Sequence, residues 1–198
     1  MFFIMEATKD PFVRFRHWWN EALASSVPTP EAMTLATSTR DGRPSARIVL
    51  LKGFDQRGFV FFTNYESRKG NEIQDNPFAA LVFYWQPLDR QIRIEGSVER
   101  VSTEESRQYF DTRPLGSRLA AWASPQSRVI VDRNELEERF AQVQARFAGQ
   151  SVALPPFWGG FRVVPTQFEF WSSQNNRLHD RECYLLEGTN WQRVCLAP

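Results

Sequence analysis

MTLATSTRDGRPSARIVLLK, residues 33–52, contains two β-prone runs on either side of a short polar segment. The runs 33–39 and 45–52 flank Arg40-Asp41-Gly42-Arg43, and an Asp-Gly pair between such runs is a strong signal for a tight turn between antiparallel strands. These residues therefore predict a β-hairpin, and the neighbouring segments can be interpreted outward from it.

Further strand patterns follow the hairpin, with short turns between them. A turn at 53–58 precedes residues 59–63, which are apolar throughout and predict a strand covered on both faces. The turn 86–89 separates predicted strands at 78–85 and 91–101, and four more are predicted at 161–164, 167–171, 179–186 and 191–195. Strands that succeed one another through tight turns favour an antiparallel barrel over alternating βαβ units.

Helical patterns occupy the start and the middle of the chain. Asp10 can cap a helix over 11–24 with Pro11 at its first position, and Ser67 can cap a short helix through residue 76 that Pro77 closes. Three more helices are predicted at 103–112, 115–123 and 132–147. We therefore expect a mainly β protein with peripheral helices, a single domain over residues 1–198 with an N-terminal helix at about 11–24 and a helical insertion at about 103–147.

Composition excludes several classes of function. The net charge is +1 over 198 residues, which gives no case for binding nucleic acid or an anionic membrane surface, and no apolar run is long enough to cross a bilayer. The apolar residues Met1 to Met5 lack the basic leader and cleavage site of a secretory signal, so a cytoplasmic location is expected. Cys183 and Cys195 are not at metal-ligand spacing, and no metal site is predicted.

Two basic segments are candidates for binding anions. Arg47 and Lys52 bracket an apolar run, and their odd separation predicts opposite faces of a strand, hence different anions or different parts of one site. Arg68 and Lys69 follow Ser67 at a predicted helix N-terminus, where free backbone N–H groups and the helix dipole favour a phosphate. Solvated strand ends and a solvated helix start are the alternative interpretations.

Two further sets could contact a ligand. Arg113, with Tyr109 before it and Ser117 after it, could hold a second phosphate through guanidinium, phenol and hydroxyl donors. Arg177, His179 and Arg181 are two residues apart, which predicts one strand face and a ligand among these cations. The residues alone thus indicate an oxyanion-rich ligand site on a small barrel, without a reaction.

Several ordered motifs resemble the pyridoxine 5'-phosphate oxidase family over nearly the whole chain. They are RIVLLK (47–52), FFTNYESRKG (61–70), QIRIEGSVER (91–100), YFDTRP (109–114), PQS (125–127), FWGGFRV (157–163), FEFW (168–171), RLHDR (177–181) and the terminal LAP. The resemblance implies an FMN-binding split β-barrel that works as a homodimer, with two FMN sites in the subunit interface.

The resemblance also implies site residues. For FMN these are Arg47, Ile48, Val49, Leu50, Leu51, Lys52, Phe62, Thr63, Arg68, Lys69, Gln91, Gln126, Ser127, Trp171 and Arg181, with Gln126 and Ser127 expected from the other subunit. For the substrate they are Lys52, Tyr109, Arg113 and Ser117 at its phosphate, and Arg177, Leu178 and His179 at its ring, with Arg177 and His179 expected to be catalytic.

The reaction implied is oxidation of pyridoxine 5'-phosphate or pyridoxamine 5'-phosphate to pyridoxal 5'-phosphate. A hydride leaves the C4' carbon for the flavin, O2 reoxidises the flavin to give H2O2, and with the amine substrate the imine hydrolyses to release ammonia. Two departures from the family pattern are visible: few residues precede Asp10 where members carry a longer arm over the substrate, and Phe62 stands where Tyr is common.

Other functions remain open from the sequence. A phenazine-type oxidase of the same fold would also bind FMN, although the set Lys52, Tyr109, Arg113 and Ser117 favours a phosphorylated substrate. A non-catalytic carrier of flavin or pyridoxal phosphate is a second alternative, and Arg177 with His179 argues against it. A nucleic-acid-binding barrel is the third, disfavoured by the balanced charge.

Overall fold

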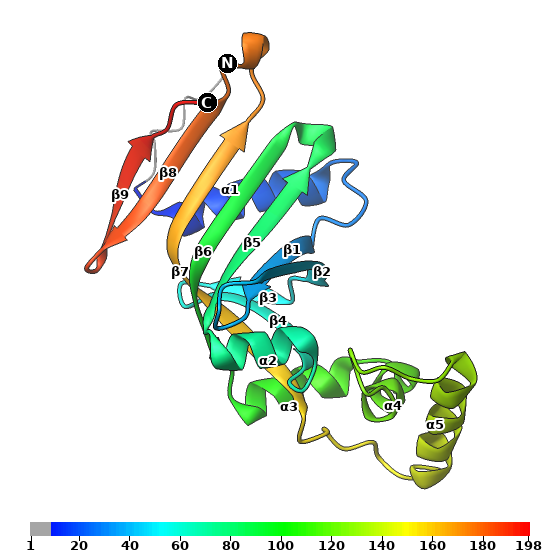
Figure 1. Ribbon diagram of the computed structural model, residues 1–198. Helices are drawn as coiled ribbons and strands as arrows, with labels where there is room; N and C mark the ends of the chain where they lie inside the picture. The colour runs from blue at the N-terminus through cyan, green and yellow to red at the C-terminus, as the bar shows by residue number, and fades with distance from the viewer. Residues whose placement is uncertain (1–8) are drawn as a thin grey trace.

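The computed structural model describes residues 9–198, and the expectations about a leader and a lid segment concern residues outside that range. Figure 1 shows a strongly curled antiparallel sheet with helices at one end and along one face. The strands are β1 (Ala32–Ser38), β2 (Pro44–Leu50), β3 (Gly53–Asp55), β4 (Gly58–Asn64), β5 (Phe78–Trp85), β6 (Arg90–Arg100), β7 (Trp158–Ser172), β8 (Asp180–Glu187) and β9 (Asn190–Cys195). The α-helices of the described part are α1 (Pro11–Ala24), α2 (Arg68–Asp75), α3 (Thr103–Thr112), α4 (Leu115–Ala123) and α5 (Arg133–Arg146).

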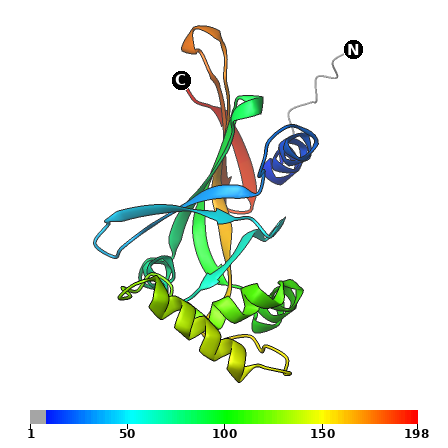
Figure 2. The ribbon, with the colours of Figure 1, turned by 90° about the vertical axis from the view of Figure 1, so that its right-hand side faces the viewer.

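The sheet has the order β2-β1-β5-β6-β7-β4-β3, and β8 and β9 extend it from β7. Every pairing is antiparallel, and β6 and β7 are the long strands around which the sheet curls into a half-barrel (Figure 2). This confirms the prediction of a mainly β, split-barrel fold with peripheral helices. Because β2 lies at the end of this order, one of its edges has no partner strand in the described part of the chain.

The predicted hairpin forms β1 and β2. The Arg40-to-Arg43 turn closes through a hydrogen bond from the Thr39 amide to the Arg43 carbonyl at 3.0 Å, and Gly42 takes the positive φ of 85° that such a turn requires. In the register of the hairpin Thr37 faces Ser45 and Leu35 faces Arg47, which sets the polar groups near α2.

Helix α1 covers the inner face of the sheet. Its N-cap is Asp10, whose Oδ1 accepts from the Phe12 amide at 2.8 Å, as the sequence predicted. Phe12, Phe15 and Trp18, at helical spacing, are buried against the sheet, with the Phe15 ring edge-on to that of Phe59 at 4.8 Å. The largest core therefore lies between α1 and the curled sheet and positions the strands that carry the site.

Two predicted boundaries are wrong. The segment 53–58, expected as a turn only, contains the short strand β3, which pairs with β4. The strands expected at 161–164 and 167–171 are a single strand, β7, because the ladder with β6 shifts register between Glu95 and Gly96 and so passes Pro165 without needing its missing N–H.

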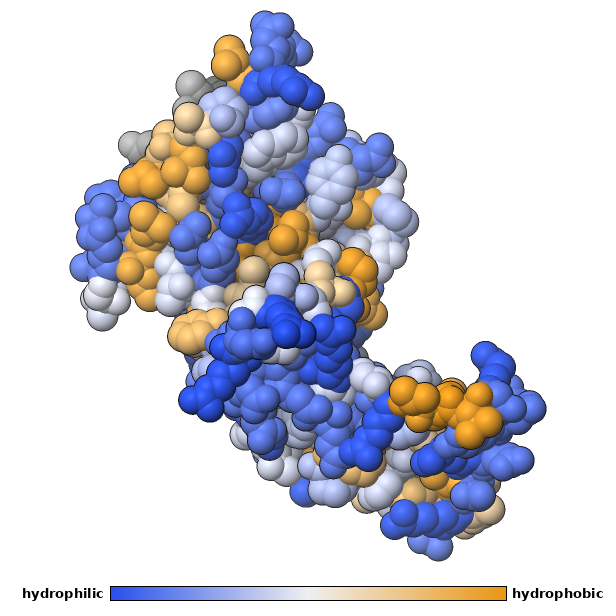
Figure 3. All heavy atoms as spheres, in the orientation of Figure 1, coloured by the Kyte–Doolittle hydropathy of each residue, from blue (hydrophilic) through white to orange (hydrophobic). Residues whose placement is uncertain are grey.

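Helices α3, α4 and α5 form a second layer at one end of the sheet, around a smaller core that contains Phe110 and Trp158. Apolar side chains also gather on the surface at this end (Figure 3), and Val129 and Val131, between α4 and α5, are 100% and 90% exposed. No helix within residues 9–198 has the length and apolar character to span a membrane.

Candidate functional site

A cavity of about 390 Å³ lies where β2, β4, α2 and α3 meet. It is lined by Arg47, Ile48, Val49, Leu50, Lys52, Phe62, Thr63, Lys69, Tyr109, Arg113, Gln126 and Trp158. All of these except Trp158 are residues that the sequence predicted for the site. The sequence therefore identified most of one cavity wall from segments that lie far apart in the chain.

Within residues 9–198, the lining carries four cations and no carboxylate. Burial lowers the pKa of Arg113, and burial together with the charge of Arg47 lowers that of Lys69. The Nη1 atom of Arg113 is buried without a hydrogen-bond partner in the described chain. Because a buried unpaired guanidinium nitrogen is costly, this set of donors suits a phosphorylated ligand that would satisfy it.

Arg47 and Lys52 reach the same cavity although strand alternation predicted opposite faces. Strand β2 ends at Leu50, the Leu51 amide then bonds the Glu31 carbonyl at 2.9 Å, and the Lys52 amide bonds the Val60 carbonyl at 2.8 Å. Strand alternation therefore does not extend to Lys52, and both cations line one cavity. Leu51 is 5% exposed and packs in the core, so its side chain is not part of the cavity wall.

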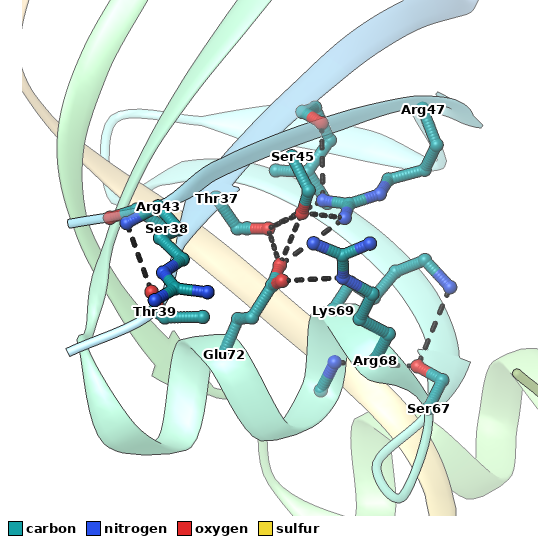
Figure 4. Close-up of polar contacts among 12 residues, drawn as sticks. Thr37, Ser38, Thr39, Arg43, Ser45, Arg47, Ser67, Arg68, Lys69 and Glu72 are labelled. Atoms are coloured by element: carbon teal, nitrogen blue, oxygen red, sulfur yellow. Dashed lines mark hydrogen bonds and ion pairs between the residues drawn. The ribbon is translucent and has the colours of Figure 1, made fainter. Parts of the chain in front are cut away.

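Helix α2 brings a network of charged groups beside the cavity (Figure 4). Glu72 is 4% exposed, and its Oε2 accepts hydrogen bonds from Thr37 at 2.5 Å, from Ser45 at 2.5 Å and from Nη2 of Arg47 at 3.3 Å. Its Oε1 accepts from Nε of Arg68 at 2.8 Å. Burial raises the pKa of Glu72, but these hydrogen bonds outweigh burial and lower it to about 2. The carboxylate is therefore charged and ties two cations together.

The sequence did not predict Glu72, Thr37 or Ser45. The four-residue spacing between Arg68 and Glu72 is a sequence signal for their ion pair. The two hydroxyls lie beside Glu72 only through the register of the β1–β2 hairpin and the packing of α2 on β1.

Helix α2 begins where the sequence predicted. The Ser67 Oγ accepts from the Gly70 amide at 3.3 Å, which places Ser67 at the N-cap. Lys69, in the first turn, lines the cavity, whereas Arg68 lies against a neighbouring hollow that Ser127 also lines.

Aromatic rings form another wall of the cavity. The Phe62 ring is stacked on Tyr109 at 4.0 Å and on Trp158 at 5.5 Å between centroids, and the Arg113 guanidinium lies 4.6 Å from the Trp158 centroid. Gly160 pairs with Phe62 across the sheet, and a Cβ there would lie 2.8 Å from the Phe62 ring. The glycine therefore leaves room for the ring that faces the cavity.

Gln126 lies in this chain's own cavity, so the expectation that it reaches the Arg47 strand from the other subunit is wrong. Its Oε1 accepts from the Thr63 hydroxyl and from Lys69 Nζ, each at 3.0 Å. Ser127 was also expected from the other subunit, but it lines the same hollow as Arg68 of its own chain. Its φ is 69°. The segment after α4 folds back onto α2, which no short-range pattern predicts.

The remaining predicted residues form a second group at the other end of β7. Gln91 pairs with Trp171, and Trp171 pairs with Arg181 on the next strand. The Arg181 Nε donates to Glu169 at 2.8 Å, which raises the pKa of Arg181, and Glu169 is 3% exposed. A buried glutamate therefore holds this arginine, as Glu72 holds Arg47 and Arg68.

Arg177 and His179 do not share a strand face with Arg181, and that prediction is wrong. Strand β8 begins at Asp180, and residues Asn175–Arg177 form a 3-10 turn in which Asn176 and Arg177 have φ of 58° and 63°. Asparagine adopts this left-handed conformation readily, so the turn interrupts the alternation. His179 still lies near the group, with its ring centroid 4.7 Å from that of Trp171, while Arg177 and Leu178 are exposed.

The two groups lie at opposite ends of one long strand. Trp158, in the cavity wall, begins β7, and Trp171 is near its end, so about 40 Å of strand separates them at roughly 3.3 Å per residue. Figure 1 shows the turn before β8 at the far end of the sheet from α2 and α3. One chain cannot bring both groups to one ligand. Ser117 of α4 is half-buried and does not line the cavity.

Two family models match the chain. The model described as pyridoxamine 5'-phosphate oxidase covers residues 19–147, and the model described as the pyridoxine 5'-phosphate oxidase C-terminal dimerisation region covers residues 158–198. The chain belongs to the pyridoxamine 5'-phosphate oxidase family. Curated family members include the pyridoxine/pyridoxamine 5'-phosphate oxidase of Bordetella petrii, 59% identical over 97% of this chain and 91% of its own length. The corresponding protein of Rubrobacter xylanophilus is 57% identical over 97% and 88%.

Solved structures support the same fold. PhzG from Burkholderia lata, determined with tetrahydrophenazine-1-carboxylic acid, has a TM-score of 0.93 at 32% identity and covers 100% of this chain and 98% of its own. A pyridoxamine 5'-phosphate oxidase-related, FMN-binding protein from Nostoc punctiforme has a TM-score of 0.69 at 19% identity, over 98% of this chain and 100% of its own, and shows the fold alone. The family is thus an oxidase family with a dimerisation region. Its members named here include both pyridoxine/pyridoxamine 5'-phosphate oxidases and PhzG, so family membership alone does not identify the substrate.

Proposed function

We propose that this protein is an FMN-dependent oxidase that converts pyridoxine 5'-phosphate or pyridoxamine 5'-phosphate to pyridoxal 5'-phosphate, with O2 as acceptor and H2O2 as product. The observation that carries the proposal is the cavity at β2, β4, α2 and α3. Among the residues that the structure describes, its lining has four cations, no carboxylate and a buried Arg113 nitrogen without a hydrogen-bond partner. Family membership and the relatives' names support the substrate.

For FMN, the cavity offers a charged end and an apolar wall. Arg47 and Lys69, with Arg68 beside them, would hold the cofactor phosphate at the start of α2, where the helix dipole adds to their charge. The exposed side chains of Ile48 and Leu50, at 65% and 39%, would pack against the flat ring. Bound FMN would supply the redox chemistry, accepting a hydride from the substrate and passing electrons to O2.

For the substrate, a second anion position would lie on the α3 side of the cavity. Lys52, Tyr109 and Arg113 would bind its phosphate, and Arg113 would gain a partner for its buried nitrogen. Ser117 belongs to this proposal through the family resemblance. The substrate ring would then lie near the Phe62 side of the aromatic wall, with water excluded by the stacked rings.

The second subunit completes the site in this proposal. In a two-fold dimer, a contact between two different surfaces occurs at two symmetric places. The Trp171 and Arg181 end of each chain can therefore meet the cavity of the other. Exposed Ile48 and Leu50 on the edge strand β2 are surfaces that a partner would cover. Arg177 and His179 of the partner would then orient the substrate C4' over the flavin.

The direct test uses purified protein. Its absorbance spectrum should show bound flavin, and pyridoxine 5'-phosphate should yield one H2O2 per turnover. Flavin-containing protein that yields no H2O2 with either B6 phosphate would contradict the proposed reaction and favour a carrier.

A second candidate function is oxidation of a reduced phenazine. The observation in its favour is the TM-score of 0.93 to PhzG, whose structure contains a tetrahydrophenazine carboxylic acid. The cations Lys52 and Arg113 in the cavity wall favour the phosphorylated substrate instead. Comparing kcat/KM for pyridoxine 5'-phosphate with that for a dihydrophenazine carboxylate decides between them.

A further inference from the structure

Glu72 is a buried acid within a group of cations, next to the cavity but not in its wall. We propose that Glu72 is a positioning residue, which holds the guanidinium groups of Arg47 and Arg68 side by side so that their remaining N–H groups receive the phosphate of FMN. This inference rests on the proposed function, since FMN is the phosphate-bearing ligand.

The hydrogen bonds of this network leave some N–H donors of Arg47 and Arg68 without a partner in the described chain (Figure 4). Both Nη atoms of Arg47 are used, Nη1 by the Leu35 carbonyl and Thr37, and Nη2 by Ser45 and Glu72. Its Nε makes no hydrogen bond within residues 9–198. Arg68 uses only Nε, toward Glu72, and both of its Nη groups remain available in the described chain. Hydrogen bonds thus hold each guanidinium group in place, and Nε of Arg47 and the Nη groups of Arg68 remain available to a ligand.

Charge balance explains why an acid is needed here. Arg47, Arg68 and Lys69 would repel one another at this spacing, and the single negative charge of Glu72 offsets part of that repulsion before a ligand arrives. Fixing long arginine side chains in advance also removes an entropy cost from binding. Because its pKa is lowered to about 2, Glu72 is charged at neutral pH.

The oxygens of the Glu72 carboxylate are already occupied. Glu72 is 4% exposed, and both its oxygens accept hydrogen bonds. It is absent from the wall of the cavity but lines the neighbouring hollow with Arg68. In the proposed site, the positive charges of Arg47 and Arg68 would offset its repulsion of a phosphate. We expect the positioning of Arg47 and Arg68 by Glu72 to favour FMN binding by more than the negative charge of Glu72 disfavours it. Removal of that charge should therefore weaken FMN binding.

The experiment measures binding of FMN and of riboflavin, which lacks the phosphate, to cofactor-depleted protein by quenching of flavin fluorescence. Glu72→Gln should raise the Kd for FMN roughly tenfold, the loss of about one charge-assisted hydrogen bond, and leave the Kd for riboflavin unchanged. Glu66→Gln is the matched control, because Glu66 is an exposed acid in the turn before α2 that pairs with Arg128 and not with Arg47 or Arg68. It should leave both constants unchanged.

The outcomes separate this inference from the proposed function. An unchanged FMN Kd in Glu72→Gln, or equal losses for FMN and riboflavin, would overturn the positioning role. Wild-type protein that binds riboflavin as tightly as FMN would instead refute the phosphate site itself. The double variant Thr37→Val/Ser45→Ala keeps the charge of Glu72 but removes the two hydroxyls that donate to Glu72 and accept from Arg47, so it disconnects the network around a charged Glu72. It should weaken FMN binding selectively, and an unchanged FMN Kd there would also overturn the inference, even if Glu72→Gln does not fold.

Discussion

Replacement of Glu72 by Gln should destabilise the protein by an amount that depends on pH. The folded state lowers the pKa of this carboxyl from 4.5 to about 2, and each unit corresponds to about 1.4 kcal/mol, so the charged form stabilises the fold by roughly 3 kcal/mol. Because the folded pKa is the lower one, this contribution is complete well above pH 4.5 and is lost as the pH falls toward 2.

The assay is urea unfolding of cofactor-depleted protein, followed by tryptophan fluorescence at one fixed protomer concentration, since dimer stability depends on concentration. The difference between wild type and Glu72→Gln should be about 3 kcal/mol at pH 7 and should shrink to about 1 kcal/mol near pH 3. Glu66→Gln controls for the loss of a nearby surface charge. A difference that is absent at pH 7, or that stays constant from pH 7 to pH 3, would refute the reasoning.

Three further substitutions test other parts of the site. Arg177→Ala should lower kcat/KM for pyridoxine 5'-phosphate by about 100-fold with little change in FMN affinity, by steady-state kinetics and flavin titration, and full catalytic efficiency would contradict its role. Gly160→Ala should push the Phe62 ring into the cavity and so raise both the Kd for FMN and the KM for the substrate. Unchanged values would contradict this prediction and show that the ring can move aside. Glu169→Gln should release Arg181 and weaken FMN binding severalfold while the dimer stays intact by size-exclusion chromatography, and an unaltered Kd would mean that Arg181 needs no support.

Most of the secondary structure followed from local patterns in the sequence. The Asp-Gly turn, the Asp10 cap and the apolar face of Phe12, Phe15 and Trp18 each depend on residues close together in the chain, and the structure confirms them. The single strand β7 did not follow, because the register shift opposite Gly96 that accommodates Pro165 is a property of the pairing with β6.

The site was predictable as a set of residues but not as an arrangement. Alternation placed Lys52 on the wrong face because β2 ends before it, and placed Arg177 on a strand that starts three residues later. Glu72 and Glu169 were not predicted. Apart from Arg68, which lies four residues before Glu72 in α2, their partners come from other elements and depend on sheet register and helix packing. The separation of the two residue groups along β7 likewise needed the fold.

In the proposed dimer, each site combines the cavity of one chain with the Trp171 and Arg181 end of its partner. Arg113→Ala removes a cavity cation, and Arg177→Ala removes a group at the far end of β7, so each variant homodimer should have little activity. After subunit exchange at equal amounts, half the dimers should be hybrids with one intact site of two, and activity should return to about a quarter of wild type. Hybrid dimers isolated by two different tags that remain as inactive as the parent variants would contradict the claim.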